Sequence, residues 1–214
     1  MRVKKLIKLF TICLIFILFF YFFNKNEKIV INWSDSELIE DFDLILTQGQ
    51  SVQSKVLHLL NLSIKGGYTH IGIVCKEGNK IYVIHATLDG TKENCIRYDE
   101  FQTFLDLSKV CKYKILRFKF MNTNIRQLLR MEVEKYRNSK IPFDYQFNNQ
   151  KHDHIYCSEL IYQIFIKAEL MRLQSFDMTK PINPNEFLYL KELISVTEKC
   201  SDKSKAISVC ATKH

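Results

Sequence analysis

Apolar and polar residues alternate in several short runs of the chain, which is the pattern of half-buried β-strands. The first run, residues 43–47, reads DLILT and ends at a Gln-Gly pair. Residues 70–76 and 80–87 alternate on either side of the turn sequence Glu-Gly-Asn, and residues 112–120 alternate again. The pattern therefore predicts a β-hairpin, with one strand before it and another after it.

In three other segments, apolar residues recur every three or four positions, as they do on one face of a helix. The first segment covers residues 51–64, where Ser51 is a typical helix cap, and the second covers residues 124–139. The third begins at Tyr156 or Cys157, and its apolar positions are Leu160, Ile161, Ile164, Phe165 and Ala168.

The predicted hairpin makes a geometric prediction about two histidines. With an even-length loop between antiparallel strands, His70 and His85 point to the same side of the sheet. They lie directly opposite or one diagonal step apart, about 4.5 to 8 Å between backbone positions. The two imidazoles can then touch. The alternatives are a loop of odd length, which separates them, or two histidines that each only cap a strand end.

The N-terminus has the order of an export signal. Residues 1–8 are basic, and residues 9–23 form an unbroken apolar run that ends without a small-residue cleavage site. We predict a signal anchor, or alternatively a cleaved signal peptide, over residues 1–25. The positive-inside rule leaves the basic end in the cytoplasm and places the following domain outside it. The localisation predicted for that domain is the bacterial cell envelope.

Composition indicates one globular domain behind this segment. The 214 residues are 47% hydrophobic and 13% aromatic, which suits a chain with a substantial core. We divide it into a connector at 26–42, a domain at 43–196 and a polar C-terminal tail at 197–214. The formal net charge is +8, but four positive charges belong to the N-terminal segment. The remaining excess is ordinary surface charge, so we expect no nucleic-acid partner.

Export changes how the seven cysteines are interpreted. Cys13 belongs to the apolar run, whereas the others would face a compartment in which disulfides persist. Cys200 and Cys210 lie in the polar tail, where a local bridge or two free surface thiols are both possible. The sequence does not determine any pairing.

Cys157 is either a nucleophile or a small core residue. It lies at the start of a predicted helix whose first turn also carries Ser158 and Glu159, both suited to a helix N-terminus. The helix dipole and a nearby imidazolium would lower the pKa of the thiol, and the thiolate is the nucleophilic form. The alternative is a buried structural thiol.

The same stretch also allows a metal-binding interpretation. His152, His154 and Cys157 are three possible zinc ligands within six residues. A fourth ligand from a second cluster is missing from the sequence pattern. We therefore expect neither a metal nor any other cofactor.

Several motifs in order resemble a known family. They are Tyr-Thr-His-Ile-Gly-Ile-Val at 68–74, Ile-Pro-Phe-Asp-Tyr-Gln-Phe at 141–147, Tyr-Cys-Ser-Glu-Leu at 156–160 and Pro-Asn-Glu-Phe at 184–187. Together they resemble the YiiX-like, circularly permuted papain-fold amidases of the NlpC superfamily, which are related to lecithin retinol acyltransferase-like proteins. The resemblance implies an α+β fold with a central antiparallel sheet packed against helices, here preceded by the N-terminal membrane segment. Histidine precedes cysteine, as the permutation implies.

Matched by position, the resemblance implies that Cys157 is the nucleophile, His70 its general base and His85 the residue that orients the base. Many members have Glu at the third position, and a neutral imidazole stabilises an imidazolium less than a carboxylate does. A second departure is Phe42, where relatives commonly have Gly before the first strand.

The combined prediction is an exported cysteine hydrolase that cleaves amide or ester bonds through a thioacyl intermediate. The Cys157 backbone N–H would face the oxyanion. The Tyr156 hydroxyl is a possible support, although packing is the more ordinary use of the ring, and Glu159 either caps the helix or binds a substrate amine. The expected substrate is a cell-wall peptide or a lipid-like acyl group. The alternatives are a membrane-associated acyltransferase and a non-catalytic envelope binding module.

Overall fold

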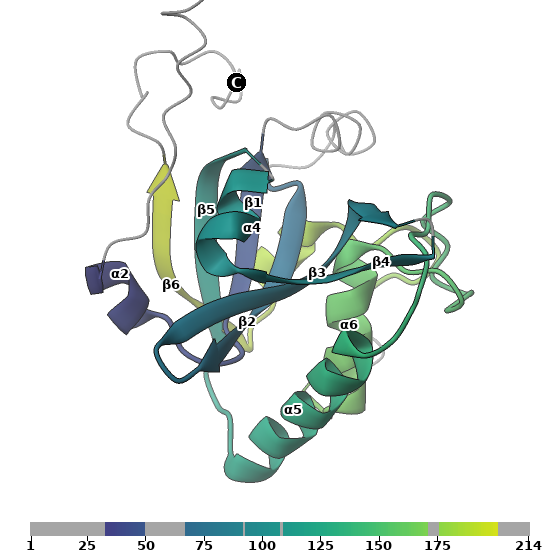
Figure 1. The fold of residues 1–214 in the computed structure, drawn as a ribbon. Coiled ribbons are helices and arrows are strands. Elements are labelled where there is room, and N and C mark those ends of the chain that lie inside the picture. The colour runs from purple at the N-terminus through teal and green to yellow at the C-terminus, as the bar shows by residue number, and fades with distance from the viewer. Residues whose placement is uncertain (1–32, 50–66, 92, 108, 171–175, 201–214) are drawn as a thin grey trace, which may run out of the picture.

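The computed structural model describes residues 33–49, 67–91, 93–107, 109–170 and 176–200, which form one sheet with helices on both faces (Figure 1). The elements, in chain order, are α2 (Trp33–Leu38), β1 (Leu44–Gly49), β2 (His70–Glu77), β3 (Lys80–Thr91), β4 (Asn94–Glu100), α4 (Phe101–Leu107), β5 (Val110–Phe118), α5 (Thr123–Arg137), α6 (Cys157–Lys167), the 3₁₀ helix η2 (Pro184–Tyr189) and β6 (Leu193–Cys200).

The sheet has six strands in the order β4-β3-β2-β1-β5-β6, and every neighbouring pair is antiparallel. The predicted hairpin is β2–β3, and its turn places Gly78 at a φ of 60°, a conformation that glycine adopts without strain. The predicted strands at 43–47 and 112–120 correspond to β1 and β5. The α+β class with a central antiparallel sheet is thus confirmed.

Two separate cores lie on the two faces of the sheet. The larger core joins the α5 and α6 side chains to alternate residues of β2, such as Ile71 and Ile73. The smaller core joins α4 to strand residues whose side chains point to the other face of the sheet, such as Val74 of β2. Figure 1 shows α4 in front of the sheet and α6 beside it. Because β1, β2 and β5 are buried on both faces, they carry more apolar residues than one-sided strands would.

The helices predicted at 124–139 and from Tyr156 or Cys157 correspond to α5 and α6. The helix predicted at 51–64 lies outside the described residues. Five of the described elements were not predicted: α2, β4, α4, η2 and β6. The edge strand β6 is mostly exposed and therefore reads as polar, so the domain boundary that we drew at 196 falls inside it.

The predicted membrane segment at 1–25 also lies outside the described residues. Within the described part of the chain, the helices are too short or too polar to cross a bilayer. No disulfide joins two of the described cysteines, and Cys200 is exposed at the end of β6. Because Cys210 is outside the described residues, the Cys200–Cys210 pairing stays a prediction.

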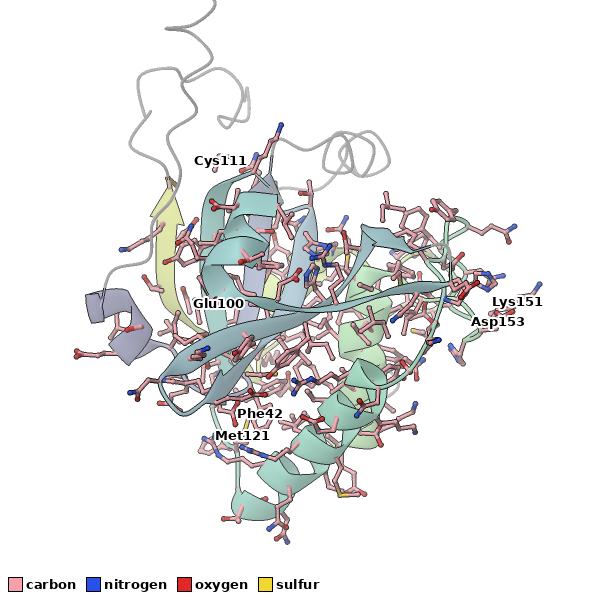
Figure 2. All side chains as sticks on the ribbon, in the orientation of Figure 1. Phe42, Glu100, Cys111, Met121, Lys151 and Asp153 are labelled. Carbon is pink, nitrogen blue, oxygen red and sulfur yellow. The ribbon has the colours of Figure 1, made fainter. Side chains whose placement is uncertain are left out.

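Phe42, which precedes β1, has a φ of 70°. This left-handed conformation favours glycine. The ring is nevertheless buried in the larger core, with 3% exposed, and the Phe42 N–H donates to the Val74 carbonyl. Met121, which precedes α5, packs against the same core, and Figure 2 labels both residues.

Candidate active site

Cys157 is the first residue of α6, and the helix cap is Tyr156 with an extended φ of −116°. The chain reaches this point through an isolated parallel bridge between Phe143 and Ile155, which fixes the direction in which α6 begins. The Cys157 side chain is almost fully buried, with 4% of the residue exposed. The predicted helix start is therefore confirmed, and the thiol lies at the positive end of the helix dipole.

Burial raises the pKa of the Cys157 thiol above its ordinary value. Hydrogen bonds from the Ser158 hydroxyl and from the backbone of Ile71, Ser158 and Cys157 itself oppose this effect without reversing it. Our expectation of a lowered pKa was therefore wrong for the resting protein. A helix N-terminus favours the thiolate by less than the loss of solvent disfavours it.

The two histidines meet as the hairpin geometry predicted. Ile73 lies opposite Ile84, so His70 and His85 are one diagonal step apart on the same face. His70 Nε2 lies 2.9 Å from His85 Nδ1, and both rings pack against Phe104 of α4. Burial and the charge of the neighbouring His85 hold the pKa of His70 well below its ordinary value. His70 is therefore a neutral imidazole at neutral pH.

Gly72 makes room for this pair. A Cβ atom at this position would lie 2.4 Å from Val83 Cγ1 and 3.0 Å from the carbonyl oxygen of Ile84. A larger residue would push β2 and β3 apart where they hold the two histidines. Glycine is needed here for close approach rather than for an unusual φ.

Asp99 is a site residue that our sequence reasoning missed. Its Oδ2 atom lies 3.0 Å from His85 Nε2, and Arg97 holds the same carboxylate with bonds of 2.8 and 2.9 Å. Burial alone would raise the Asp99 pKa, but these hydrogen bonds and charges lower it to about 2. The carboxylate is thus ionised at any physiological pH. Recognition of β4 as the partner of β3 would have revealed it, because Arg97 lies opposite His85.

The ionised carboxylate determines which His85 nitrogen donates to it and, when His85 is neutral, the tautomer of His70 as well. A carboxylate only accepts hydrogen bonds, so His85 Nε2 must donate to it. In a neutral His85, Nδ1 then accepts, and His70 Nε2 is the donor. The lone pair of a neutral His70 therefore lies on Nδ1. With His85 neutral, Asp99 thus makes His70 Nδ1 a proton acceptor, whereas a protonated His85 donates from both ring nitrogens and leaves the His70 lone pair on Nε2.

Cys157 lies close to the strand that carries His70, although no hydrogen bond between Sγ and the imidazole is present among the described residues. The backbone of Ile71, which follows His70, bonds to the thiol. Thr69, which precedes His70, lines a cavity together with Cys157. The His70 ring packs on the α4 side of the sheet, whereas Cys157 belongs to the core on the α6 side.

Tyr156 and Glu159 are both engaged by the protein. The Tyr156 hydroxyl accepts from the Ile182 N–H at 2.7 Å and donates to Asn149 Oδ1, and its ring packs against Phe147. Glu159 is fully buried, with Oε1 2.9 Å from His152 Nδ1 and Oε2 without a hydrogen-bond partner in the described structure. Burial raises its pKa, and the backbone of Tyr156 at the helix cap opposes this rise. Packing for Tyr156 and capping for Glu159 are the roles that these contacts support.

The three residues of the zinc interpretation, His152, His154 and Cys157, do not form a ligand set. His152 Nδ1 lies 2.9 Å from Glu159 Oε1, and His154 faces Asp153 at the surface. Figure 2 places Lys151 and Asp153 at the outer edge of the molecule, whereas Cys157 is buried. Among the residues that the structure describes, no group of three or more His, Cys, Asp or Glu side chains could hold a metal ion.

A cavity of about 320 Å³ opens beside Cys157. Its walls come from three regions: the end of the segment before β2, the segment before α6 with the first turn of that helix, and the segment before η2. The lining residues are Thr69, Tyr145, Gln146, Phe147, Tyr156, Cys157, Ser158, Pro181, Ile182 and Pro184. The volume is within the range of small-molecule sites.

A family model described as the permuted papain-like amidase enzyme, YaeF/YiiX, C92 family, matches residues 39–206. The chain belongs to this family. It is therefore an amidase-type, cysteine-dependent hydrolase with a permuted papain-like fold. The matched residues include Cys157, both histidines of the pair and Asp99.

A solved structure agrees with this fold. It is the crystal structure of the metalloprotein YiiX from Escherichia coli O157:H7, which matches with a TM-score of 0.58 and 20% sequence identity. The match covers 75% of this chain and 98% of that one. At this identity the likeness establishes the fold alone. No curated protein matches the chain.

Proposed function

We propose that Cys157 is the nucleophile of this hydrolase, that His70 is its general base and that His85 orients the base. The observation that carries the proposal is the hydrogen-bonded line from Asp99 through His85 to His70. The residue after His70 is Ile71, whose backbone bonds to the Cys157 thiol. The substrate is an amide or ester of a cell-wall peptide or of a lipid-like acyl group.

The reaction has two steps. His70 Nδ1 takes the thiol proton while the Cys157 sulfur attacks the carbonyl carbon, and the leaving amine or alcohol then takes this proton from the imidazolium. Water attacks the resulting thioester with His70 as base, which releases the carboxylic acid and restores the thiol. The Cys157 and Ser158 amides at the start of α6 stabilise the oxyanion.

The resting charges favour a general-base route over a preformed ion pair. The pKa of the thiol is raised and that of His70 is lowered, so both groups are neutral before substrate binds. Proton transfer therefore accompanies attack on the carbonyl. It requires the His70 ring to approach the thiol at the start of β2, where His70 is partly exposed.

Tyr156 and Glu159 support this site indirectly. The Tyr156 hydroxyl joins the segment before η2 to the start of α6, and the buried Glu159 caps the helix. Both contacts position Cys157. Neither side chain needs to touch the substrate.

The basic and apolar order of residues 1–25 supports export to the bacterial cell envelope, with the domain outside the cytoplasm. Accessibility tests this part of the proposal. The domain of the full-length protein should be digested by protease added to intact spheroplasts, with a cytoplasmic protein as the control. Protection until detergent is added would contradict export.

Trapping of an acyl-enzyme tests the chemistry. The full-length protein is incubated with an envelope extract, digested and weighed, and we expect an added acyl mass on the Cys157 peptide. The adduct should be absent from Cys157→Ala and strongly reduced in His70→Ala. A binding module without catalysis gives no adduct in any variant, and an acyltransferase gives an acylated acceptor instead of the free acid.

A further inference from the structure

The cavity beside Cys157 is lined by uncharged side chains throughout the described residues. Its polar groups are hydroxyls, a thiol and one amide, from Thr69, Ser158, Tyr145, Tyr156, Cys157 and Gln146. The rest of its wall is aromatic or aliphatic, from Phe147, Pro181, Ile182 and Pro184. A charged ligand group inside it would lose water and gain no counter-charge.

Thr69 has an unusual environment within this lining. Only 2% of the residue is exposed, and its Oγ1 atom is buried with no hydrogen-bond partner in the described structure. Its backbone is fixed, because the Thr69 N–H donates to the Thr47 carbonyl at 2.9 Å. A buried hydroxyl without a partner destabilises the fold, so a ligand atom that accepts its hydrogen bond recovers this cost.

The position of Thr69 indicates which ligand atom it meets. Thr69 and Cys157 line the same cavity, and Ile71, two residues along β2, bonds to the thiol through its backbone. Thr69 lines the cavity beside the attacking sulfur, and its buried hydroxyl, once turned towards the cavity, is suited to the oxygen of the carbonyl under attack. That oxygen gains negative charge in the reaction and accepts hydrogen bonds more strongly as it does so.

We propose that this cavity binds the acyl part of an uncharged amide or ester, and that Thr69 Oγ1 donates a hydrogen bond to its carbonyl oxygen. This inference rests on the proposed role of Cys157 as nucleophile. It selects the lipid-like acyl group over the cell-wall peptide, because wall peptides carry carboxylates and amines that the uncharged side chains described around this cavity do not stabilise.

Two ester probes of equal length test the substrate class. One is the p-nitrophenyl ester of octanoic acid, and the other is the p-nitrophenyl half-ester of octanedioic acid, which ends in a carboxylate. We expect the neutral probe to acylate Cys157 of the full-length protein roughly 10²-fold faster, as burial of an unpaired charge requires. Cys157→Ala gives the background rate. Equal rates, or a faster charged probe, would overturn the inference.

Two variants test Thr69. Thr69→Val removes the hydroxyl and keeps the shape, and we expect acylation by the octanoyl probe to fall roughly 10²-fold, the usual effect of losing one oxyanion donor. Thr69→Ser keeps the hydroxyl and should recover most of this loss. If Thr69 were only structural, the probe would acylate Cys157 of Thr69→Val at the wild-type rate, and the variant protein would only be more stable than the wild type.

Stability measurements separate these effects from misfolding. Thr47 also has a buried hydroxyl without a partner in the described structure. Thr69→Val and Thr47→Val should therefore both match or exceed the wild-type Tm. Failure of every probe to acylate Cys157 would reject the proposed function itself. Acylation that ignores probe charge and Thr69 would reject only this inference.

Discussion

His85 Nε2 lies 3.0 Å from Asp99 Oδ2, and this contact makes Asp99 the residue that sets the proton positions of the histidine pair. Asp99→Asn should lower the rate of Cys157 acylation roughly 10²-fold, because an amide can donate to His85 and reverse the tautomers. The measurement is the pH profile of kcat/KM. We expect a lower maximum and a shifted acidic limb, whereas a purely structural residue would change the maximum alone.

Glu100→Gln is the matched control for this variant. Glu100 is the next residue of β4 and is exposed, and Figure 2 shows it at the end of that strand before α4. The Glu100→Gln substitution removes one negative charge from the same strand without changing a residue that contacts His85. A wild-type profile for Asp99→Asn, or equal effects of the two variants, would contradict a positioning role for Asp99.

Glu159 predicts an unusual pH dependence of stability. Burial and the nearby Asp144 raise its pKa to about 8, against 4.5 for an ordinary Glu. The folded protein then binds the proton more tightly than the unfolded chain, so the free energy of unfolding falls as pH rises from 4.5 to 8. Glu159→Gln should remove this slope. In urea denaturation, the free energy of unfolding of this variant should equal that of the wild type near pH 5 and exceed it at pH 8.

His152 provides the competing interpretation of the same group. If the 2.9 Å contact between His152 Nδ1 and Glu159 Oε1 acted mainly as an ion pair, Glu159 would stay ionised. Glu159→Gln would then be less stable than the wild type near pH 6, the opposite of our expectation. Glu100→Gln again serves as the surface control and should leave the slope unchanged.

The sequence predicted the elements whose side chains have a clear period. The β2–β3 hairpin placed His70 beside His85 because the register of a two-residue turn determines which side chains share a face. The start of α6 at Cys157 followed from the apolar face behind it. These features depend on neighbours in the chain, so one sequence is sufficient to find them.

The missed features depend on contacts between distant segments. β4 reads NCIRYDE and has no clear alternation, because its polar residues serve the histidine pair and the surface together, so Asp99 was overlooked. The sign of the Cys157 pKa shift depends on burial under segments far along the chain, such as that of Ile182. A helix N-terminus was visible in the sequence, but the loss of solvent that outweighs it was not.

The raised thiol pKa predicts slow alkylation of Cys157. Only the thiolate reacts, so its rate with iodoacetamide should be low at pH 7 and rise about tenfold per pH unit to above pH 9. Peptide mass spectrometry measures this, with the exposed Cys200 of the same molecule as the internal reference. His70→Ala should leave alkylation unchanged but slow acylation roughly 10²-fold or more. A plateau below pH 8 that His70→Ala abolishes would instead show a resting ion pair.

Phe42 tests whether packing outweighs backbone strain. Its φ of 70° costs about 1 to 2 kcal/mol relative to glycine, so Phe42→Gly relieves strain. The same change empties a buried site beneath Arg130, whose guanidinium carbon lies 5.7 Å from the ring centroid. Loss of a buried Phe side chain costs about 3 to 5 kcal/mol. The lost packing should outweigh the relieved strain, and urea denaturation should show a net loss of roughly 1 to 4 kcal/mol. A variant as stable as the wild type would mean that the strain at this position is larger than its φ indicates, and that glycine is the better residue before β1.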